Sequence, residues 1–114
     1  MKPAAFAYNR AASVDHCLEL LTQHGAEAKL LAGGQSLIPV LNMRLAAPAH
    51  LIDISRLSEL GSIEITDSCV RVGAAVTHAE LEADDSAHAA LPILRQALVN
   101  VAHPAIRNLS LIHI

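Results

Sequence analysis

Two adjacent glycines, Gly33 and Gly34, are the residues of this sequence whose type and spacing best fit a chemical task. They follow one apolar run and precede Gln35, Ser36 and a second apolar run. Glycines allow a tight turn and leave the neighbouring backbone N–H groups accessible. If a helix begins after Ser36, its N-terminus adds unpaired donors and the positive end of its dipole. These features predict a cradle for a phosphate or pyrophosphate, with Ser36 capping the helix and donating its hydroxyl to the anion.

The same pattern also fits an ordinary strand–turn–helix corner, in which the glycines serve only the geometry of the chain. Taken by itself, the spacing favours this corner, because short glycine motifs recur by chance. The run matches neither G-x-G-x-x-G nor G-x-x-x-x-G-K-S/T. The sequence therefore lacks the signatures of the Rossmann-type dinucleotide fold and of the P-loop nucleoside triphosphatases.

The other polar side chains with regular placement predict local structure rather than catalysis. Asp53 follows an apolar run, and we expect it to cap the next turn rather than to bind a ligand. Glu80 forms a capping box with Thr77, and His78, just inside that helix, is expected to be solvated. We find no nucleophile paired with a base, so no catalytic residue is assigned.

The composition indicates a folded domain with an aliphatic core. Apolar residues make up 53% of the 114 residues and charged residues 17%, which argues against disorder. The formal net charge is −3, and the scattered Lys and Arg form no basic stripe for nucleic acid. No apolar run approaches the ~20 residues of a transmembrane helix, and the N-terminus lacks an apolar signal segment. We therefore expect a cytoplasmic protein without a transmembrane segment or a nucleic-acid partner.

Cysteine and histidine give no metal-site pattern. Cys17 and Cys69 are far apart, and both are expected to be small buried hydrophobic residues rather than a disulfide. The seven histidines are dispersed, there is no C-x-x-C motif, and most histidines are expected at the surface. The sequence therefore predicts no bound metal.

Hydrophobic periodicity places these residues on an α+β framework. Strands are predicted at residues 5–8, 28–31 and 51–54, and a hairpin at 63–66 and 69–72. Helices are predicted at 14–24 between Ser13 and Gly25, at 37–45 with an interruption or a kink at Pro39, and at 56–60 after Ser55. Two more helices open at Thr77 and near Pro92, and Pro104 is expected to end the last one. The break near Ser55 predicts two lobes, residues 1–55 and 56–108.

A series of sequence blocks resembles the medium, FAD-binding subunit of molybdenum hydroxylases of the carbon monoxide dehydrogenase and xanthine dehydrogenase type. The blocks are LAGGQSLIP (31–39), MRLA (43–46), PAHLIDI (48–54), VGAAVTHAEL (72–81) and VAHPAIRN (101–108). They keep the family's order and cover nearly all of residues 1–108. The resemblance implies an FAD-binding PCMH-type, vanillyl-alcohol-oxidase-like domain of two α+β lobes, here the first lobe and part of the second, truncated.

The resemblance also implies a function and a set of partners. The chain would be an oxidoreductase subunit that receives electrons from an iron–sulfur small subunit, itself fed by a molybdenum-cofactor large subunit. It would pass them through FAD to an external electron acceptor. The substrate would be chosen by the large subunit, so carbon monoxide, a purine, an aldehyde or an N-heterocycle all stay open.

Carried over by position, the resemblance implies which residues hold FAD. The pyrophosphate would lie on the backbone of residues 32–36, with further contacts from the strand before this loop and from the second lobe. The cofactor-binding residues implied are Lys29, Leu30, Leu31, Ala32, Gly33, Gly34, Gln35, Ser36, Leu37, Ala74, Thr77, Val101 and Ile106.

The sequence departs from the family pattern after Asn108. The family continues with Arg-Gly-Thr-x-Gly-Gly, its second FAD loop, whereas this chain reads LSLIHI at 109–114. We expect residues 109–114 to be a non-native tail on an N-terminal fragment that binds FAD weakly or not at all. Two alternatives stay open: another PCMH-type flavoprotein oxidase or reductase, and a non-enzymatic α+β anion-binding module.

Overall fold

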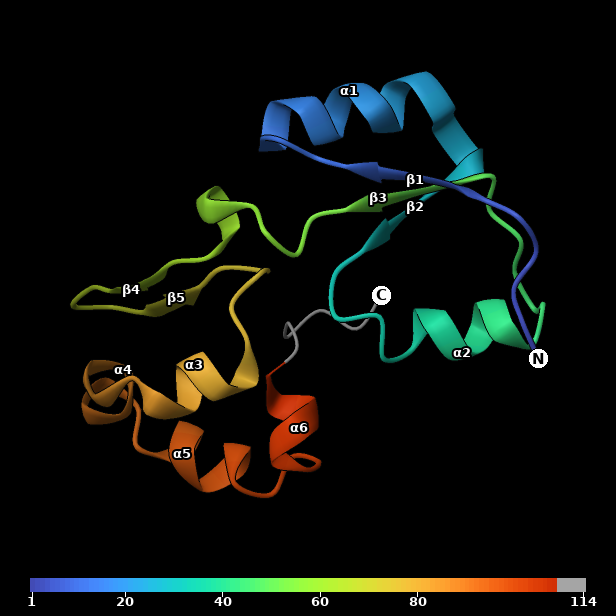
Figure 1. Ribbon diagram of the computed structural model, residues 1–114. Coiled ribbons are helices and arrows are strands. Elements are labelled where there is room, and N and C mark those ends of the chain that lie inside the picture. Colours follow the sequence, from blue (N-terminus) through green and yellow to red (C-terminus); the bar gives the residue numbers. More distant parts are fainter. Residues whose placement is uncertain (109–114) are drawn as a thin grey trace. The chain divides into compact units, whose positions relative to one another are not determined.

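The computed structural model describes residues 1–108, and the expected tail at 109–114 lies outside them. The described chain forms two compact units, Met1–Leu57 and residues 58–108. The predicted order of β-α-β-α-β, then a hairpin, then helices is confirmed (Figure 1). No helix among residues 1–108 is long and apolar enough to cross a membrane.

The first unit is built on a parallel three-stranded sheet. Its strands are β1 (Ala7–Arg10), β2 (Ala28–Leu31) and β3 (His50–Asp53), arranged in the order β1-β3-β2. Both outer strands pair with β3 in the same register, so that Ala7 and Ala28 each lie opposite His50. The first strand starts two residues later than the sequence predicted, and the other two agree closely.

Helix α1 (Val14–His24) is the crossover between β1 and β2, and both of its ends follow the sequence signals. The Ser13 hydroxyl oxygen accepts a hydrogen bond from the N–H of His16 at 3.0 Å, as an N-cap does. At the other end Gly25 has a φ of +54°, and its N–H bonds to the carbonyl of Leu21. This conformation suits glycine because a Cβ would strain it. A short 3-10 turn, η1 (Gly25–Glu27), then leads into β2.

The central strand β3 buries one side chain on each face of the sheet. Leu51, 1% exposed, packs with Leu37 and Leu41 of helix α2 (Leu37–Asn42). Ile52 is fully buried and points to the opposite face because side chains alternate along a strand. Figure 1 shows α1 and α2 on opposite sides of the sheet. Each such burial contributes about 1.5–3 kcal/mol, so β3 is the centre of this core.

Helix α2 is shorter than predicted, and it has no kink. It ends at Asn42, and Arg44, with a φ of +56°, turns the chain away two residues later. Pro39 lies in the first turn of the helix, where a missing N–H costs no intrahelical hydrogen bond. The expected interruption or kink at Pro39 is therefore wrong.

The second unit begins with a 3-10 turn, η2 (Ser58–Leu60), and the predicted hairpin. Strands β4 (Ile63–Ile65) and β5 (Val70–Val72) are antiparallel, with Ile63 opposite Val72. The predicted helix at 56–60 is reduced to η2. Ser55 does not cap it, because the Ser55 N–H and hydroxyl both bind the Asp53 carboxylate.

Four short helices complete the second unit. They are α3 (His78–Ala83), α4 (Asp85–Ala90), α5 (Ile93–Leu98) and α6 (Pro104–Arg107). The buried residues Val76, Leu81, Ala87 and Leu98 form the core, against which Ile63, Val70, Val72 and Leu94 pack. The predicted capping box at α3 is confirmed: the Thr77 hydroxyl accepts from the N–H of Glu80, and the Glu80 carboxylate accepts from the N–H of Thr77.

Several expectations about single residues are wrong in this unit. Pro104 begins α6 at its first turn instead of ending the preceding helix, which stops at Leu98. His78 is 8% exposed rather than solvated, and His88 is buried as well, because short helices turn these positions toward the core. Cys69 is exposed in the hairpin turn, whereas Cys17 is buried as expected, and both are free thiols.

Candidate functional site

The glycine loop at residues 32–37 starts where the sheet stops. The carbonyl of Leu31, the last residue of β2, accepts the N–H of Ile54 at 2.9 Å. Beyond this bond the chain leaves β3 and turns into α2. The carbonyl of Gly34 accepts the N–H of Ile38 at 2.9 Å, so the first helical turn is already closed around the loop. The loop is thus held at both ends by backbone hydrogen bonds.

The backbone N–H groups within this loop have no acceptor among the described residues. None of the N–H groups of residues 32–37 donates a hydrogen bond to any atom of residues 1–108. Ala32 and Leu37 are each only 8% exposed, and Gly34 is also buried. Buried N–H groups are nearly always paired in folded proteins. Gly33 is half-buried and Gln35 and Ser36 are exposed, so the unpaired donors of this turn include buried and accessible ones, which fits an anion with several acceptor oxygens.

Gly34 is required by the geometry of the loop. Its φ is +73°, which disfavours any residue with a side chain. A Cβ at this position would lie 3.0 Å from Cγ1 of Ile38 and 3.2 Å from Cδ1 of Leu31. The absence of a side chain at Gly34 therefore lets the Ile38 and Leu31 side chains pack close to its backbone.

Ser36 does not cap α2, which corrects the expectation from the sequence. Its backbone is already helical, with φ −91° and ψ −40°, and its side chain makes no capping hydrogen bond. An N-cap residue normally has an extended backbone, which lets its oxygen reach back to the helix N–H groups. The Ser36 side chain is exposed instead. Because α2 is only six residues long, the loop N–H groups matter more here than the helix dipole.

The remaining residues implied by the resemblance lie in both units. Lys29 is exposed, and Leu30 and Leu31 are half-buried, all three in β2. In the second unit Ala74 and Thr77 follow β5, and the Thr77 hydroxyl is already engaged by the capping box. Val101, between α5 and α6, and Ile106, in α6, are half-buried.

A polar cluster around Asp53, at the end of β3, was only partly predicted. Its Oδ1 accepts from the N–H of Ser55 at 2.8 Å and from the Ser55 hydroxyl at 2.7 Å, which confirms the expected turn cap. The Tyr8 hydroxyl donates to the other carboxylate oxygen. The register of the parallel strands could have indicated Tyr8 as a partner of Asp53. Tyr8 lies opposite Leu51, and Leu51 and Asp53 are two residues apart on the same face of β3.

The Asp53 contacts set the protonation state of the cluster. Partial burial raises the pKa of the Asp53 carboxyl, but the hydrogen bonds from Tyr8 and Ser55, together with the charge of Arg10, outweigh it. The net result is a pKa below the ordinary value. The same hydrogen bond to Asp53 raises the pKa of the Tyr8 hydroxyl. Asp53 is therefore an ionised structural acceptor.

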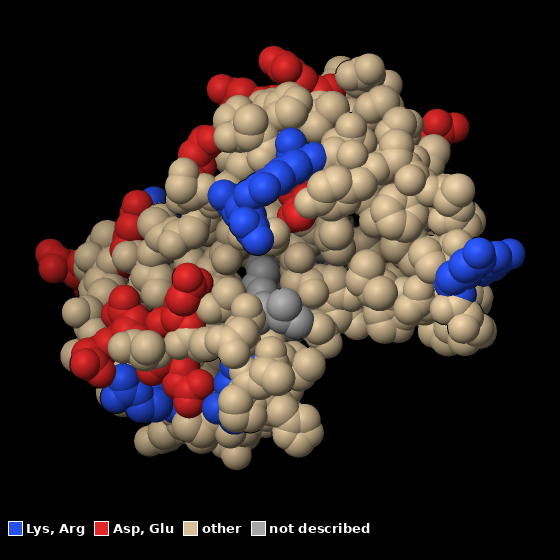
Figure 2. Space-filling model, in the orientation of Figure 1, with Lys and Arg blue, Asp and Glu red and all other residues tan. Residues whose placement is uncertain are grey.

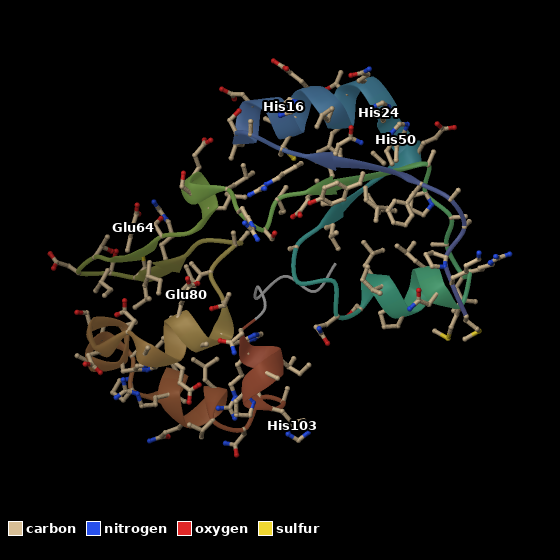
Figure 3. The ribbon with its side chains drawn as sticks, in the orientation of Figure 1. His16, His24, His50, Glu64, Glu80 and His103 are labelled. Carbon is tan, nitrogen blue, oxygen red and sulfur yellow. The ribbon has the colours of Figure 1, made fainter. Side chains whose placement is uncertain are left out.

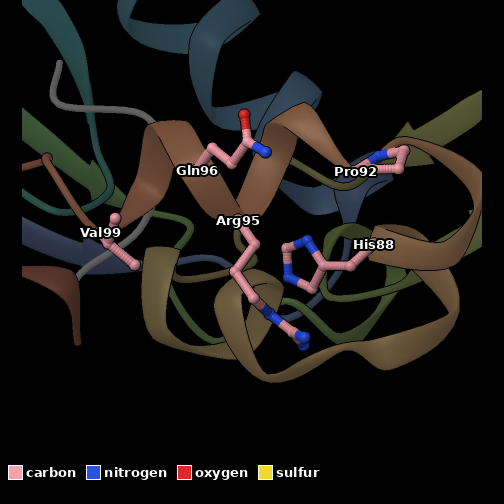
Figure 4. A pocket seen from close by; sticks show the side chains of 5 residues that line it. All are labelled: His88, Pro92, Arg95, Gln96 and Val99. Atoms are coloured by element: carbon pink, nitrogen blue, oxygen red, sulfur yellow. The ribbon is translucent and has the colours of Figure 1, made fainter.

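A hollow on the second unit is lined by His88, Pro92, Arg95, Gln96 and Val99 (Figure 4). The Arg95 guanidinium is already paired, because it donates to Asp85 at 2.7 Å and to the carbonyl of Glu82 at 3.4 Å. The hydrogen bond from Arg95 lowers the pKa of Asp85. With its charge neutralised, the hollow offers no built site for a charged ligand.

Neither metal ligands nor a basic surface stand out in the described chain. Among residues 1–108, no three or more His, Cys, Asp or Glu side chains are grouped to hold a metal ion. The rings of His24 and His50 stack on each other with centroids 3.6 Å apart (Figure 3), which is a packing contact rather than a ligand set. Figure 2 shows Lys and Arg in separate small groups on the visible face, with acidic side chains among them.

Comparisons with known proteins point in one direction. The family model described as "FAD binding domain in molybdopterin dehydrogenase" matches residues 4–112. The alpha subunit of the 6-hydroxypseudooxynicotine dehydrogenase complex of Paenarthrobacter nicotinovorans is 45% identical over 108 residues, covering 95% of this chain and 36% of the relative. The carbon monoxide dehydrogenase medium chain of Hydrogenophaga pseudoflava is 43% identical, covering 95% of this chain and 38% of the relative.

Solved structures agree with these relatives. A crystal structure of the Cu,Mo-CO dehydrogenase in its cyanide-inactivated form matches with a TM-score of 0.92 and 39% identity, covering 99% of this chain and 40% of that one. Quinoline 2-oxidoreductase from Pseudomonas putida 86 matches with a TM-score of 0.89 and 40% identity, covering 95% and 38%. The chain thus spans well under half the length of the proteins that it matches.

Proposed function

We propose a function for this chain from the premise that it belongs to the family of FAD-binding domains in molybdopterin dehydrogenases. FAD is the cofactor of this family, and the relatives are named as oxidoreductase subunits. The proposal is that the chain is part of the FAD-binding subunit of a molybdenum-containing hydroxylase or dehydrogenase. Within it, residues 1–55 and 56–108 would be the first lobe and the start of the second lobe of the flavin domain.

The run of unpaired backbone N–H groups at residues 32–37 carries the assignment of the cofactor-binding loop. In the proposed complex these groups donate to the phosphate oxygens of FAD, which are multiple charged acceptors. Gly34 allows the loop its positive-φ turn, and the exposed Ser36 hydroxyl adds a further donor. Bound FAD supplies the electron-carrying chemistry, while the protein binds and orients it.

The partners belong to the same proposal. The relatives include a medium chain and a subunit of a dehydrogenase complex, which supports partner subunits for this chain as well. We propose that an iron–sulfur small subunit delivers electrons, that a molybdenum-cofactor large subunit acts on the substrate, and that an external acceptor receives the electrons. A cytoplasmic location stays a prediction from the sequence.

Fluorescence titration with FAD tests the proposal. It is run on the 114-residue chain and on the full product of the gene that encodes it, with ADP and riboflavin as competitors. If the loop binds the pyrophosphate, ADP displaces FAD because it carries that group, whereas riboflavin competes only through a site for the flavin ring. We expect the full product to bind, and the 114-residue chain to bind weakly, because it spans only 36–40% of its relatives.

The possible results test two claims separately: that FAD is the cofactor, and that residues 32–37 bind its pyrophosphate. No FAD binding by the full product would contradict the proposed function and favour the non-enzymatic alternative. Binding that ADP does not weaken would keep FAD as the cofactor but remove the pyrophosphate from residues 32–37. Displacement of FAD by ADP would support both FAD as the cofactor and the binding of its pyrophosphate by residues 32–37.

A further inference from the structure

Arg107, the last residue of α6, has more hydrogen bonds than any other arginine of the described chain. Its Nε donates to the carbonyl of Val101 at 2.8 Å, and its Nη2 donates to the carbonyl of Val99 at 2.8 Å. Its Nη1 lies 3.3 and 3.2 Å from the two carboxylate oxygens of Glu82. The Arg107 side chain is 14% exposed, against 74% for Arg71, whose one ion pair with Glu64 lies in the hairpin. The Arg107 guanidinium is thus largely buried, and each of its nitrogens has a hydrogen-bond acceptor.

The carbonyls that Arg107 binds belong to the turn at residues 99–102, directly after α5. The last carbonyls of α5 already accept hydrogen bonds from residues 99–101, so Arg107 serves the turn itself. Nη2 of Arg107 is also 3.5 Å from the carbonyl of Ala102. Ala102 has a φ of +48°, a left-handed conformation that a residue with a Cβ keeps only where its surroundings hold it. The guanidinium therefore holds a strained turn in place.

Glu82, the carboxylate partner of Arg107, is itself fixed to two other helices. Its backbone carbonyl lies 2.9 Å from Nε2 of His88 in α4 and accepts from Arg95 of α5 at 3.4 Å. The planar guanidinium can bind the carboxylate and the carbonyls at the same time, which a lysine ammonium cannot do in this geometry. Arg107 thus ties α6 and the 99–102 turn to the frame formed by α3, α4 and α5.

We propose that Arg107 is a positioning residue for the flavin: it fixes the backbone on which Val101 and Ile106 are presented. Val101 lies in the turn that Arg107 binds, and Ile106 precedes Arg107 in α6. This inference rests on the proposed function and on the FAD contact that the resemblance implies for these two half-buried side chains. Arg107 acts only through them, since its own donors are taken up by protein acceptors.

The test uses the full product of the gene with FAD bound, in wild-type form and as Arg107→Lys. Glu82→Gln is the second variant, because it removes the carboxylate charge but leaves the carbonyl contacts of Arg107 intact. Arg71→Lys is the matched control, an exposed arginine of the same unit with one carboxylate partner. Two readouts are taken: amide hydrogen exchange of the segment 98–106 in the apoprotein, and the visible absorption and fluorescence of bound flavin.

For Arg107→Lys we expect exchange in segment 98–106 to become about tenfold faster or more, because local opening becomes easier. FAD stays bound through the loop at residues 32–37, but its absorption and fluorescence change. Glu82→Gln changes both readouts in the same direction and to a smaller extent, and Arg71→Lys changes neither.

A flavin spectrum identical to that of the wild type in Arg107→Lys, with FAD bound, would overturn the inference and leave the proposed function standing. If Arg107→Lys does not fold, the Glu82→Gln spectrum decides in the same way. Failure of the wild-type protein to bind FAD would overturn the proposed function, and this inference with it.

Discussion

Replacing Gly34 by alanine adds a Cβ to the loop that is proposed to hold the FAD pyrophosphate. At a φ of +73° the left-handed backbone costs a residue with a Cβ about 1–2 kcal/mol. Alanine also has fewer conformations than glycine in the unfolded chain, and this offsets about 0.4–1 kcal/mol of the backbone strain. The new Cβ would lie 3.0 Å from Cγ1 of Ile38 and 3.2 Å from Cδ1 of Leu31. Ile38 is exposed and can move, so the net destabilisation should be about 1 kcal/mol.

Gly25→Ala is the matched control for this substitution. Gly25 has a φ of +54° and a ψ of −130°, so an alanine is strained there too, but its Cβ would meet nothing within 4 Å. Both variants should lower the Tm of unfolding, by about 4–8 °C for each kcal/mol in a domain of this size. Thermal unfolding followed by circular dichroism measures this effect.

Only Gly34→Ala should weaken FAD binding by the full gene product. A displaced N–H loses a hydrogen bond to a charged phosphate, worth about 1.5–3 kcal/mol, which corresponds to an about 10- to 100-fold higher Kd. Equal FAD affinities for wild type and Gly34→Ala, at matched loss of stability, would refute the reasoning. An equal loss of affinity in Gly25→Ala would refute it too, because that variant leaves the loop donors unchanged.

Three further predictions concern stability and reactivity. Thr77→Ala removes the capping box of α3 and should cost about 1 kcal/mol in urea unfolding; Thr77→Ser should restore most of it, and an unchanged midpoint for Thr77→Ala would contradict the capping role. Because the pKa of Asp53 is lowered in the folded state, its contribution to stability is present above the ordinary value of 3.8 and is lost as the pH falls through the folded pKa. Asp53→Asn should therefore be less stable than the wild type at neutral pH, with the gap closing in acid; a gap that does not change with pH would count against this assignment. Burial raises the pKa of the Cys17 thiol, so iodoacetamide at pH 8 should modify the exposed Cys69 first and Cys17 only on unfolding, as mass spectrometry of peptides can show; early labelling of Cys17 would speak against its burial.

The strands and the longest helix could be predicted because their signals are local. Ser13 and Gly25 bracket α1 with an N-cap and a left-handed glycine, and both act as the sequence indicates. The capping box of Thr77 and Glu80 is equally local. Asp53 was correctly expected to cap its own turn, because an aspartate can reach the N–H two residues ahead without help from the tertiary fold.

The predictions that failed depend on contacts between segments far apart in the sequence, or on where a helical turn begins. Ser36 was expected to cap α2, but the bond from the Ile38 N–H to Gly34 starts the helical turn earlier and leaves Ser36 inside it. His78 is buried by the packing of its unit, which no spacing reveals. The contacts of Arg107 with Val99, Val101 and Glu82 exist only once three helices are assembled.

The loop proposed to bind the cofactor was only partly predictable. Gly33 and Gly34 indicated a turn with accessible N–H groups, yet spacing could not distinguish a binding loop from a structural corner. The proposal of a binding loop rests on the positive φ of Gly34 and on the absence of acceptors for the N–H groups of residues 32–37 among the described residues. Both are properties of the folded backbone.

The strand order β1-β3-β2 has a consequence for how the chain emerges from the ribosome. The central strand is the last of the three to be synthesised, and both outer strands pair only with it. Until His50–Asp53 has left the exit tunnel, β1 and β2 have no partner, and the apolar side of α2 has no Leu51 to cover it. The nascent N-terminal segment must therefore remain unpaired and open to chaperones until late in the synthesis of this unit, because parallel, non-local pairing delays folding.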